Sequence, residues 1–85
     1  MAGCEQLLEK AKASSANLTY DELIKLAECY GWFFRRNTGG SHVIYSNPDA
    51  VHNKHLSFVR GRGKVASYQV RNLLAAIELL EKTEK

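Results

Sequence analysis

The sequence has no long run of apolar residues, although 45% of its residues are hydrophobic. A transmembrane helix needs about 20 consecutive apolar residues, so we expect no membrane-spanning segment and no membrane partner. The opening stretch, MAGCEQLLEKAKASS, also lacks the apolar centre that marks a signal peptide. These two absences predict a cytoplasmic protein.

Cysteine is scarce as well, and the two that occur, Cys4 and Cys29, have none of the close spacings typical of metal sites. Without a secretion signal, we expect both to be free thiols. His52 and His55 form an HxxH pair, but Asp49 is the only acidic residue near them, so the zinc signal is weak. We expect these two histidines to lie in a solvent-exposed loop, and we expect neither a metal nor another cofactor.

Repeats, low-complexity tracts and linkers are also absent, and 85 residues are close to the smallest size at which one core holds a fold unaided. A chain of this size can bury roughly 60% of the surface that it exposes when unfolded. Its eight aromatic residues are enough for one compact core. We therefore treat residues 1–85 as a single domain.

Acidic residues are nearly missing from the middle of the chain. From Arg35 to Arg71 there are seven cations and one acid, a net charge of +6, whereas the two flanks together carry −3. Charge divided in this way indicates a basic surface supported by neutral or acidic helices. Such a surface favours a polyanionic partner, although strands and loops can also be rich in arginine by chance.

Three segments show the apolar spacing of helices. Residues 4–13 form a short one, and a second is predicted over about residues 20–30, because Thr19 and Glu22 make a capping box and Gly31 follows as a C-terminal glycine. A last helix is predicted after Ser67, which can cap it. Its apolar stripe consists of Val70, Leu73, Leu74, Ile77 and Leu80.

Three β-like runs lie between the second and third helices: WFFRR (32–36), HVIYS (42–46) and HLSFVR (55–60). The first two are joined by NTGG, and NPDAVHN leads to the third. The order is α-α-β-β-β-α, which predicts an α+β fold with a three-stranded antiparallel sheet. Its α-β-β-β-α part is the order of double-stranded RNA-binding domains. We assign residues 17–83 to this core and residues 1–16 to an N-terminal helical extension.

The segment RRNTGGSHVIY (35–45) carries the first candidate chemistry. An imidazole can accept and donate protons near neutral pH, so His42 could take the proton of a ribose 2′-hydroxyl while Arg35 and Arg36 hold the phosphate. That reaction needs no metal. The alternative is a histidine that caps the hairpin or packs against a neighbouring ring. Ser41 is adjacent to His42 and points elsewhere in a strand, so a phosphate contact or a turn hydrogen bond suits it better than a catalytic dyad.

The segment RGRGKVASYQVR (60–71) is the second candidate. Its glycine-spaced cations lead into the start of a helix, where free N–H groups favour anions. Arg60, Arg62, Lys64 and Arg71 are therefore candidate phosphate contacts, with a solvated charged turn as the alternative. Trp32 and Tyr45 could stack on bases. Large aromatic residues on alternating strands are more often part of a core, and we expect this of Trp32.

Three segments, LTYDELIKLAECYGW, RRNTGGSHVIY and KVASYQVRNLL, resemble in order and spacing the HicA-type toxins of bacterial toxin–antitoxin modules. The resemblance covers about residues 17–80, and the Gly-Ser-His element before an apolar-aromatic strand is the hallmark of that family. It implies a double-stranded-RNA-binding-like fold, an mRNA endonuclease activity independent of the ribosome, and a HicB antitoxin that covers the active site. By position, His42 is the presumed catalytic residue, and Gly40 and Ser41 belong to the same turn.

The leading hypothesis is thus a type II toxin that cleaves mRNA without a metal, with His42 as general acid and base. The residues expected to bind RNA are Arg35, Arg36, Gly40, Ser41, Arg60, Arg62, Lys64 and Arg71. One alternative is a non-catalytic RNA-binding module of the same fold, which needs the basic surface but not the imidazole. Another is a protein-interaction domain whose basic face receives an acidic partner.

Overall fold

The computed structural model describes residues 2–50, 53–61 and 63–83. The elements in chain order are α1 (Ala2–Ala13), α2 (Tyr20–Cys29), β1 (Phe33–Gly39), β2 (His42–Ser46), β3 (His55–Val59) and α3 (Ser67–Thr83). The three strands form one antiparallel sheet in the order β1-β2-β3. The prediction of an α+β fold with the layout of double-stranded RNA-binding domains is confirmed.

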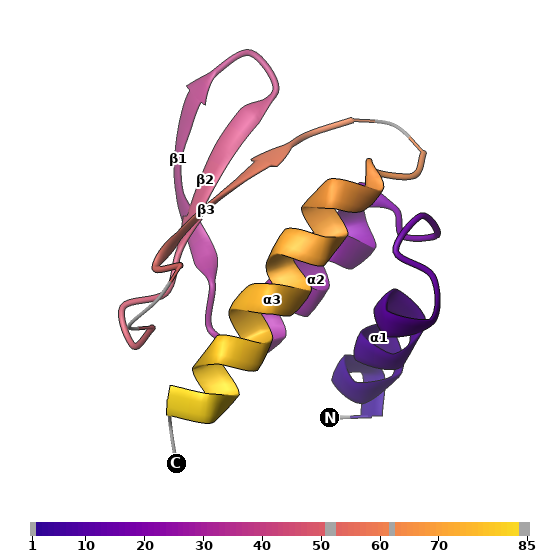
Figure 1. Ribbon diagram of the computed structural model, residues 1–85. Coiled ribbons are helices and arrows are strands. Elements are labelled where there is room, and N and C mark those ends of the chain that lie inside the picture. The colour runs from indigo at the N-terminus through magenta and orange to yellow at the C-terminus, as the bar shows by residue number, and fades with distance from the viewer. Residues whose placement is uncertain (1, 51–52, 62, 84–85) are drawn as a thin grey trace.

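The helices gather on one side of the sheet. Figure 1 shows the sheet on one side, α1 on the other, and α2 and α3 between them. The opposite face of the sheet is left open by all three described helices, and we call it the open face. None of these helices combines the length and the apolar character that crossing a bilayer requires.

The core lies between the sheet and the α2–α3 layer. Residues of β2 and β3 alternate, so that Val43, Tyr45, Leu56 and Phe58 are buried while their neighbours are not. Tyr45 packs edge-on against Phe58, with ring centroids 5.6 Å apart, and burial raises the pKa of its hydroxyl. From the helices, the fully buried side chains include Leu23, Leu26, Val70 and Leu73.

Trp32 is fully buried, as expected from the sequence. Its indole Nε1–H donates to the carbonyl oxygen of Asn53 at 3.0 Å, so the polar edge of the ring is satisfied where the chain approaches β3. Tyr45 is also largely buried. Both aromatic residues therefore belong to the core, and neither presents a face on which an RNA base could stack.

Helix α2 has the ends that the sequence predicts. At the start, Thr19 and Glu22 form the capping box, each side chain accepting a hydrogen bond from the other residue's backbone N–H. At the end, Gly31 takes φ +101°, and Trp32 N–H donates to Ala27 O at 3.0 Å while Gly31 N–H donates to Glu28 O at 3.2 Å. These two bonds make a Schellman motif, which turns the chain directly into β1.

Gly31 is the glycine that this turn requires, and Gly31→Ala is expected to lower the free energy of unfolding by about 2 kcal/mol. Alanine at this position would be held in a backbone conformation that only glycine adopts readily, and its Cβ would lie 3.0 Å from the side-chain nitrogen of Asn47. Asn47 is buried and donates to Tyr30 O at 3.1 Å, so its side chain cannot easily move away from the added Cβ. Urea unfolding followed by circular dichroism would measure the change.

Gly3→Ala is the matched control for that experiment. A Cβ at Gly3 would meet no atom within 4 Å, and the residue lies inside α1. Because alanine is a better helix former than glycine, stability should stay the same or rise by up to about 1 kcal/mol. Equal losses in the two variants would contradict the role assigned to the Gly31 turn.

Helix α1 is joined to α2 by a disulfide between Cys4 and Cys29, whose Cα atoms are 5.9 Å apart. The expectation of two free thiols was therefore wrong. It was drawn from sequence spacing and compartment, and neither reveals that two helices place the thiols side by side. Lys10 reinforces this connection through a 2.8 Å ion pair with Glu22. That hydrogen bond, together with the Thr19 backbone N–H, lowers the pKa of the Glu22 carboxyl.

Candidate active site on the open face of the sheet

The hairpin between β1 and β2 is tighter than the sequence suggests. We expected β1 to end at residue 36 and NTGG to form the connection, but β1 continues to Gly39 and only residues 40–41 make the turn. Gly39 and Gly40 have φ of +130° and +54°, which glycine adopts without strain. The register shifts leave Arg35 and Thr38 without partners on β2. Bulges of this kind re-aim side chains and are common beside active sites.

His42 is the first residue of β2 and is exposed. Because Val43 and Tyr45 face the core, the alternation along the strand directs His42 to the open face. Its neighbours across the sheet are Gly39 on β1 and Val59 on β3. Among the described residues its ring has no hydrogen-bond partner, and Gly39 has no side chain to cover it. The imidazole is therefore accessible from solvent. A histidine that only capped the hairpin or packed against a neighbouring ring would not need to be accessible.

Arg36 shares the open face with His42. It pairs with Ile44, which lies two residues beyond His42 on the same side of β2. Diagonal neighbours of this kind have their Cα atoms roughly 7–8 Å apart, within the reach of an arginine side chain. Arg35 is the unpaired residue of the first bulge and is also exposed. Arg36 is therefore a diagonal neighbour of the imidazole on the open face, and Arg35 precedes Arg36 on β1.

The turn residue Ser41 connects this site to the second basic segment. Its carbonyl oxygen accepts a 2.7 Å hydrogen bond from the backbone N–H of Arg60, directly after β3. Arg60 and Lys64, both exposed, then line a shallow pocket together with Tyr68 and Gln69 of α3. The Gln69 side-chain oxygen accepts from Val59 N–H at 2.7 Å, which holds the start of α3 against the end of β3.

The prediction that Ser67 caps the last helix is wrong. Ser67 does not cap α3 from outside; it is the first helical residue, and its Oγ accepts a hydrogen bond from Arg71 Nη1 at 3.2 Å. Arg71 is thereby held along the first turn of α3, on the exposed side of the helix. Arg62 lies outside the described residues, as does His52.

His55 forms a side-chain contact on the open face that the sequence does not predict. We expected it to be exposed and placed it both in a loop and at the start of the third strand; it begins β3, where it is exposed and pairs with Ser46 of β2. Its Nδ1 lies 2.6 Å from Ser46 Oγ. The alternation in HLSFV, read together with the partner strand, was the available signal. No group of three or more His, Cys, Asp or Glu side chains that could hold a metal occurs among residues 2–50, 53–61 and 63–83.

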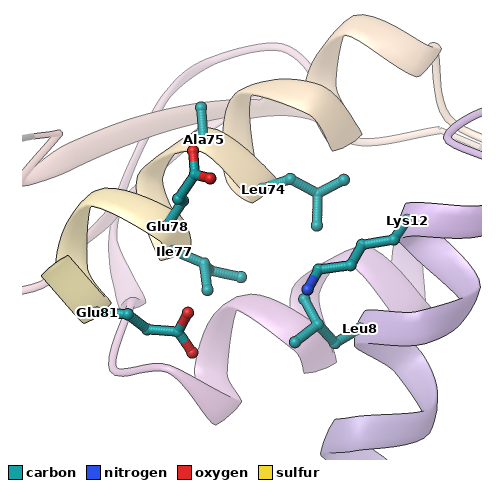
Figure 2. Close-up of a pocket in the computed structure, with 7 residues that line it drawn as sticks. All are labelled: Leu8, Lys12, Leu74, Ala75, Ile77, Glu78 and Glu81. Atoms are coloured by element: carbon teal, nitrogen blue, oxygen red, sulfur yellow. The ribbon is translucent and has the colours of Figure 1, made fainter.

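A further pocket lies between α1 and α3, away from the open face. Figure 2 shows Leu8 and Lys12 of α1 on one side, with Leu74 and Ile77 of α3 facing them. Glu78 and Glu81 complete its lining and give it an acidic rim. Acidic side chains repel a polyanion, so the surface that carries His42 and Arg36, and not this groove, is the candidate nucleic-acid surface.

Comparison with known proteins agrees with the resemblance seen in the sequence. The family model described as the HicA toxin of bacterial toxin–antitoxin systems matches residues 20–79. This range includes the hairpin, His42 and both basic segments, and it leaves out α1. No curated protein and no solved structure gives a match. The chain therefore belongs to the HicA family of toxins, which act in toxin–antitoxin pairs.

Proposed function

We propose that this toxin is an endoribonuclease that cleaves mRNA without a metal ion, with His42 as the general acid and base. The observation that carries the proposal is the exposed imidazole of His42 at the start of β2, between the arginines of β1 and the Ser41–Arg60 contact. A ribose–phosphate backbone needs a proton acceptor and nearby cations, and both face the same open surface.

The reaction follows from these groups. The neutral imidazole takes the proton of a ribose 2′-hydroxyl, and the oxygen attacks the adjacent phosphorus. A bond forms between the 2′-oxygen and phosphorus, and the bond from phosphorus to the 5′-oxygen breaks. The imidazolium then returns the proton to the departing 5′-oxygen. The products are a 2′,3′-cyclic phosphate and a 5′-hydroxyl.

The cations would position the RNA and stabilise the charge on the phosphate. Arg36 lies on the open face with His42, Arg60 directly follows β3 at the contact with Ser41, and Lys64 lines the pocket at the start of α3. An arginine can hold two phosphate oxygens at once. Arg35, Arg71, Gly40 and Ser41 complete the expected RNA-binding surface, with Gly40 allowing the strand to approach the backbone. Arg62 belongs to the proposed set by sequence alone. These contacts would weaken as salt rises.

The proposal is tested by incubating the purified protein with a long mRNA in buffers with and without EDTA. We expect cleavage at equal rates in both, because no step uses a metal. The new ends should be 2′,3′-cyclic phosphate and 5′-hydroxyl, which ligation-based end mapping distinguishes from 5′-phosphate. Cleavage that stops in EDTA would contradict the mechanism, and binding without cleavage would favour the non-catalytic RNA-binding module.

A toxin of this family has an antitoxin partner, and we further propose that the partner is a HicB-like protein that covers the open face. The charge favours this arrangement, because residues 35–71 carry one acidic residue against seven cations and Arg36 lies on the open face beside His42. An acidic protein seated there would exclude RNA from His42. Copurification of an acidic protein encoded beside this chain would support the proposal.

A further inference from the structure

The open face carries a second ordered polar pair, at the end of β2 opposite to His42. Ser46 is the last residue of β2 and His55 the first of β3, and the register places them directly opposite each other. The 2.6 Å contact between Ser46 Oγ and His55 Nδ1 fixes the orientation of the imidazole. Fold stability does not require an ordered hydroxyl–imidazole pair on an exposed sheet surface, since water would satisfy both groups.

The pair leaves one ring nitrogen for an external partner. Nδ1 is engaged with Ser46, so Nε2 is the atom that another molecule can reach, and within the described residues it has no partner. His55 is exposed, and the preceding Lys54 is exposed and cationic. An anion or a hydroxyl-rich chain therefore suits this end of the face better than an apolar surface does.

His42 and Ser46 lie on the same side of one strand. They are separated by four residues, which is about 13 Å at the rise of a β-strand. Ile44 and its partner Ser57 lie between them on the open face. At about 3.4 Å for each stacked nucleotide, this distance corresponds to about four nucleotides of a single strand. One RNA strand could thus contact both histidines at the same time.

A pocket opens beside His55, at the edge of the sheet. It has a volume of about 350 Å³ and lies between β3 and α3. Amide side chains from Asn53 and Asn72 line it, with Leu56 and Phe58 contributing apolar surface. Amide groups can hydrogen-bond to the edge of an unstacked base, and an apolar wall can pack against its ring. A pocket of this composition fits a nucleobase.

We propose that the Ser46–His55 pair is a second RNA contact, which binds the sugar–phosphate backbone a few nucleotides from the bond cleaved at His42, and that the pocket lined by Asn53 and Asn72 receives the base of that nucleotide. This inference rests on the proposed ribonuclease function. His55 would be a positioning residue: it holds the strand in register and does not touch the reacting atoms. Because the RNA would bind both at His42 and at the Ser46–His55 pair, the toxin would require a minimum length of RNA substrate.

The first test measures binding without cleavage, so that it remains informative if the catalytic proposal fails. A fluorescent twelve-nucleotide RNA is titrated against the His42→Ala variant and against the same variant with His55→Ala added. We expect the second change to weaken binding about tenfold, the size of one polar contact to a charged group. Asn72→Ala should also weaken binding, whereas Lys25→Ala on α2 is the surface control. Equal affinity with and without His55 would overturn the inference.

The second test uses substrate length. For the otherwise unchanged protein, kcat/KM is measured with the twelve-nucleotide RNA and with a dinucleotide that contains only the scissile bond. We expect His55→Ala to reduce the preference for the longer RNA about tenfold, mainly through KM. His55→Gln, which keeps a side-chain acceptor for Ser46, should restore part of it. A loss of the same size for both substrates would overturn the inference, because it would indicate a general structural defect.

Discussion

Replacing His42 by alanine is expected to lower the rate of RNA cleavage by about 10²–10⁴-fold, the contribution of one well-placed general acid and base. RNA affinity and the free energy of unfolding should change little. The side chain is exposed, it faces Gly39 and Val59 across the sheet, and its ring makes no hydrogen bond with the described residues. Cleavage of a defined RNA, with binding and urea unfolding measured in parallel, separates these quantities.

The matched variant for that experiment is His55→Ala, which removes the other described imidazole from the same face. The two changes should differ in kind: the loss at His42 appears in kcat, and the loss at His55 appears in KM. In cells, induction of the wild-type chain should arrest growth and create new RNA 5′ ends, and induction of His42→Ala should do neither. Undiminished cleavage by His42→Ala would exclude this imidazole as the catalyst.

Reduction of the Cys4–Cys29 disulfide is expected to lower the free energy of unfolding by about 3 kcal/mol. The bond closes a loop of 25 residues, and cross-linking a loop of that length restricts the unfolded chain by about this amount. Domains of this size have only about 5–15 kcal/mol of net stability, so the change would be large. Urea unfolding with and without a thiol-free reductant measures it directly.

The control is the double variant Cys4→Ser/Cys29→Ser, whose stability should equal that of the reduced protein and should not respond to reductant. Helix α1 lies outside the range matched by the family model. The hairpin and His42 should therefore keep their RNA-binding and cleavage properties in the double variant at low temperature. An oxidised and a reduced protein of equal stability would contradict the loop-closure argument.

Local signals in the sequence predicted most of the fold. The capping box at Thr19 and the glycine at 31 gave both ends of α2, because capping depends on residues only a few positions apart. The NTGG segment (37–40) predicted the β1–β2 hairpin, although β1 continues through two bulges to Gly39 instead of ending at residue 36. Bulges depend on which partner residues face each other, and the pattern of one strand does not contain that information.

The same distinction separates the parts of the site that were predicted from those that were not. His42 and the arginines at 35–36 lie within one hairpin, so their proximity follows from local sequence. The Ser46–His55 pair and the Cys4–Cys29 bond each join residues from different elements. Their partners become evident only when register and helix packing are known. The contact between Ser41 and Arg60 belongs to this second group as well.

Strand β1 has one further consequence, for the behaviour of the protein at high concentration. It forms an edge of the sheet, all seven of its residues are exposed, and two of them are phenylalanines. An edge with these properties invites a strand from another molecule and can begin fibrous aggregation. The irregularities at Arg35 and Thr38 interrupt the row of backbone donors and acceptors, so a flat foreign strand cannot pair along its whole length. The bulges that shape the hairpin thus also disfavour self-assembly of the protein through the edge strand β1.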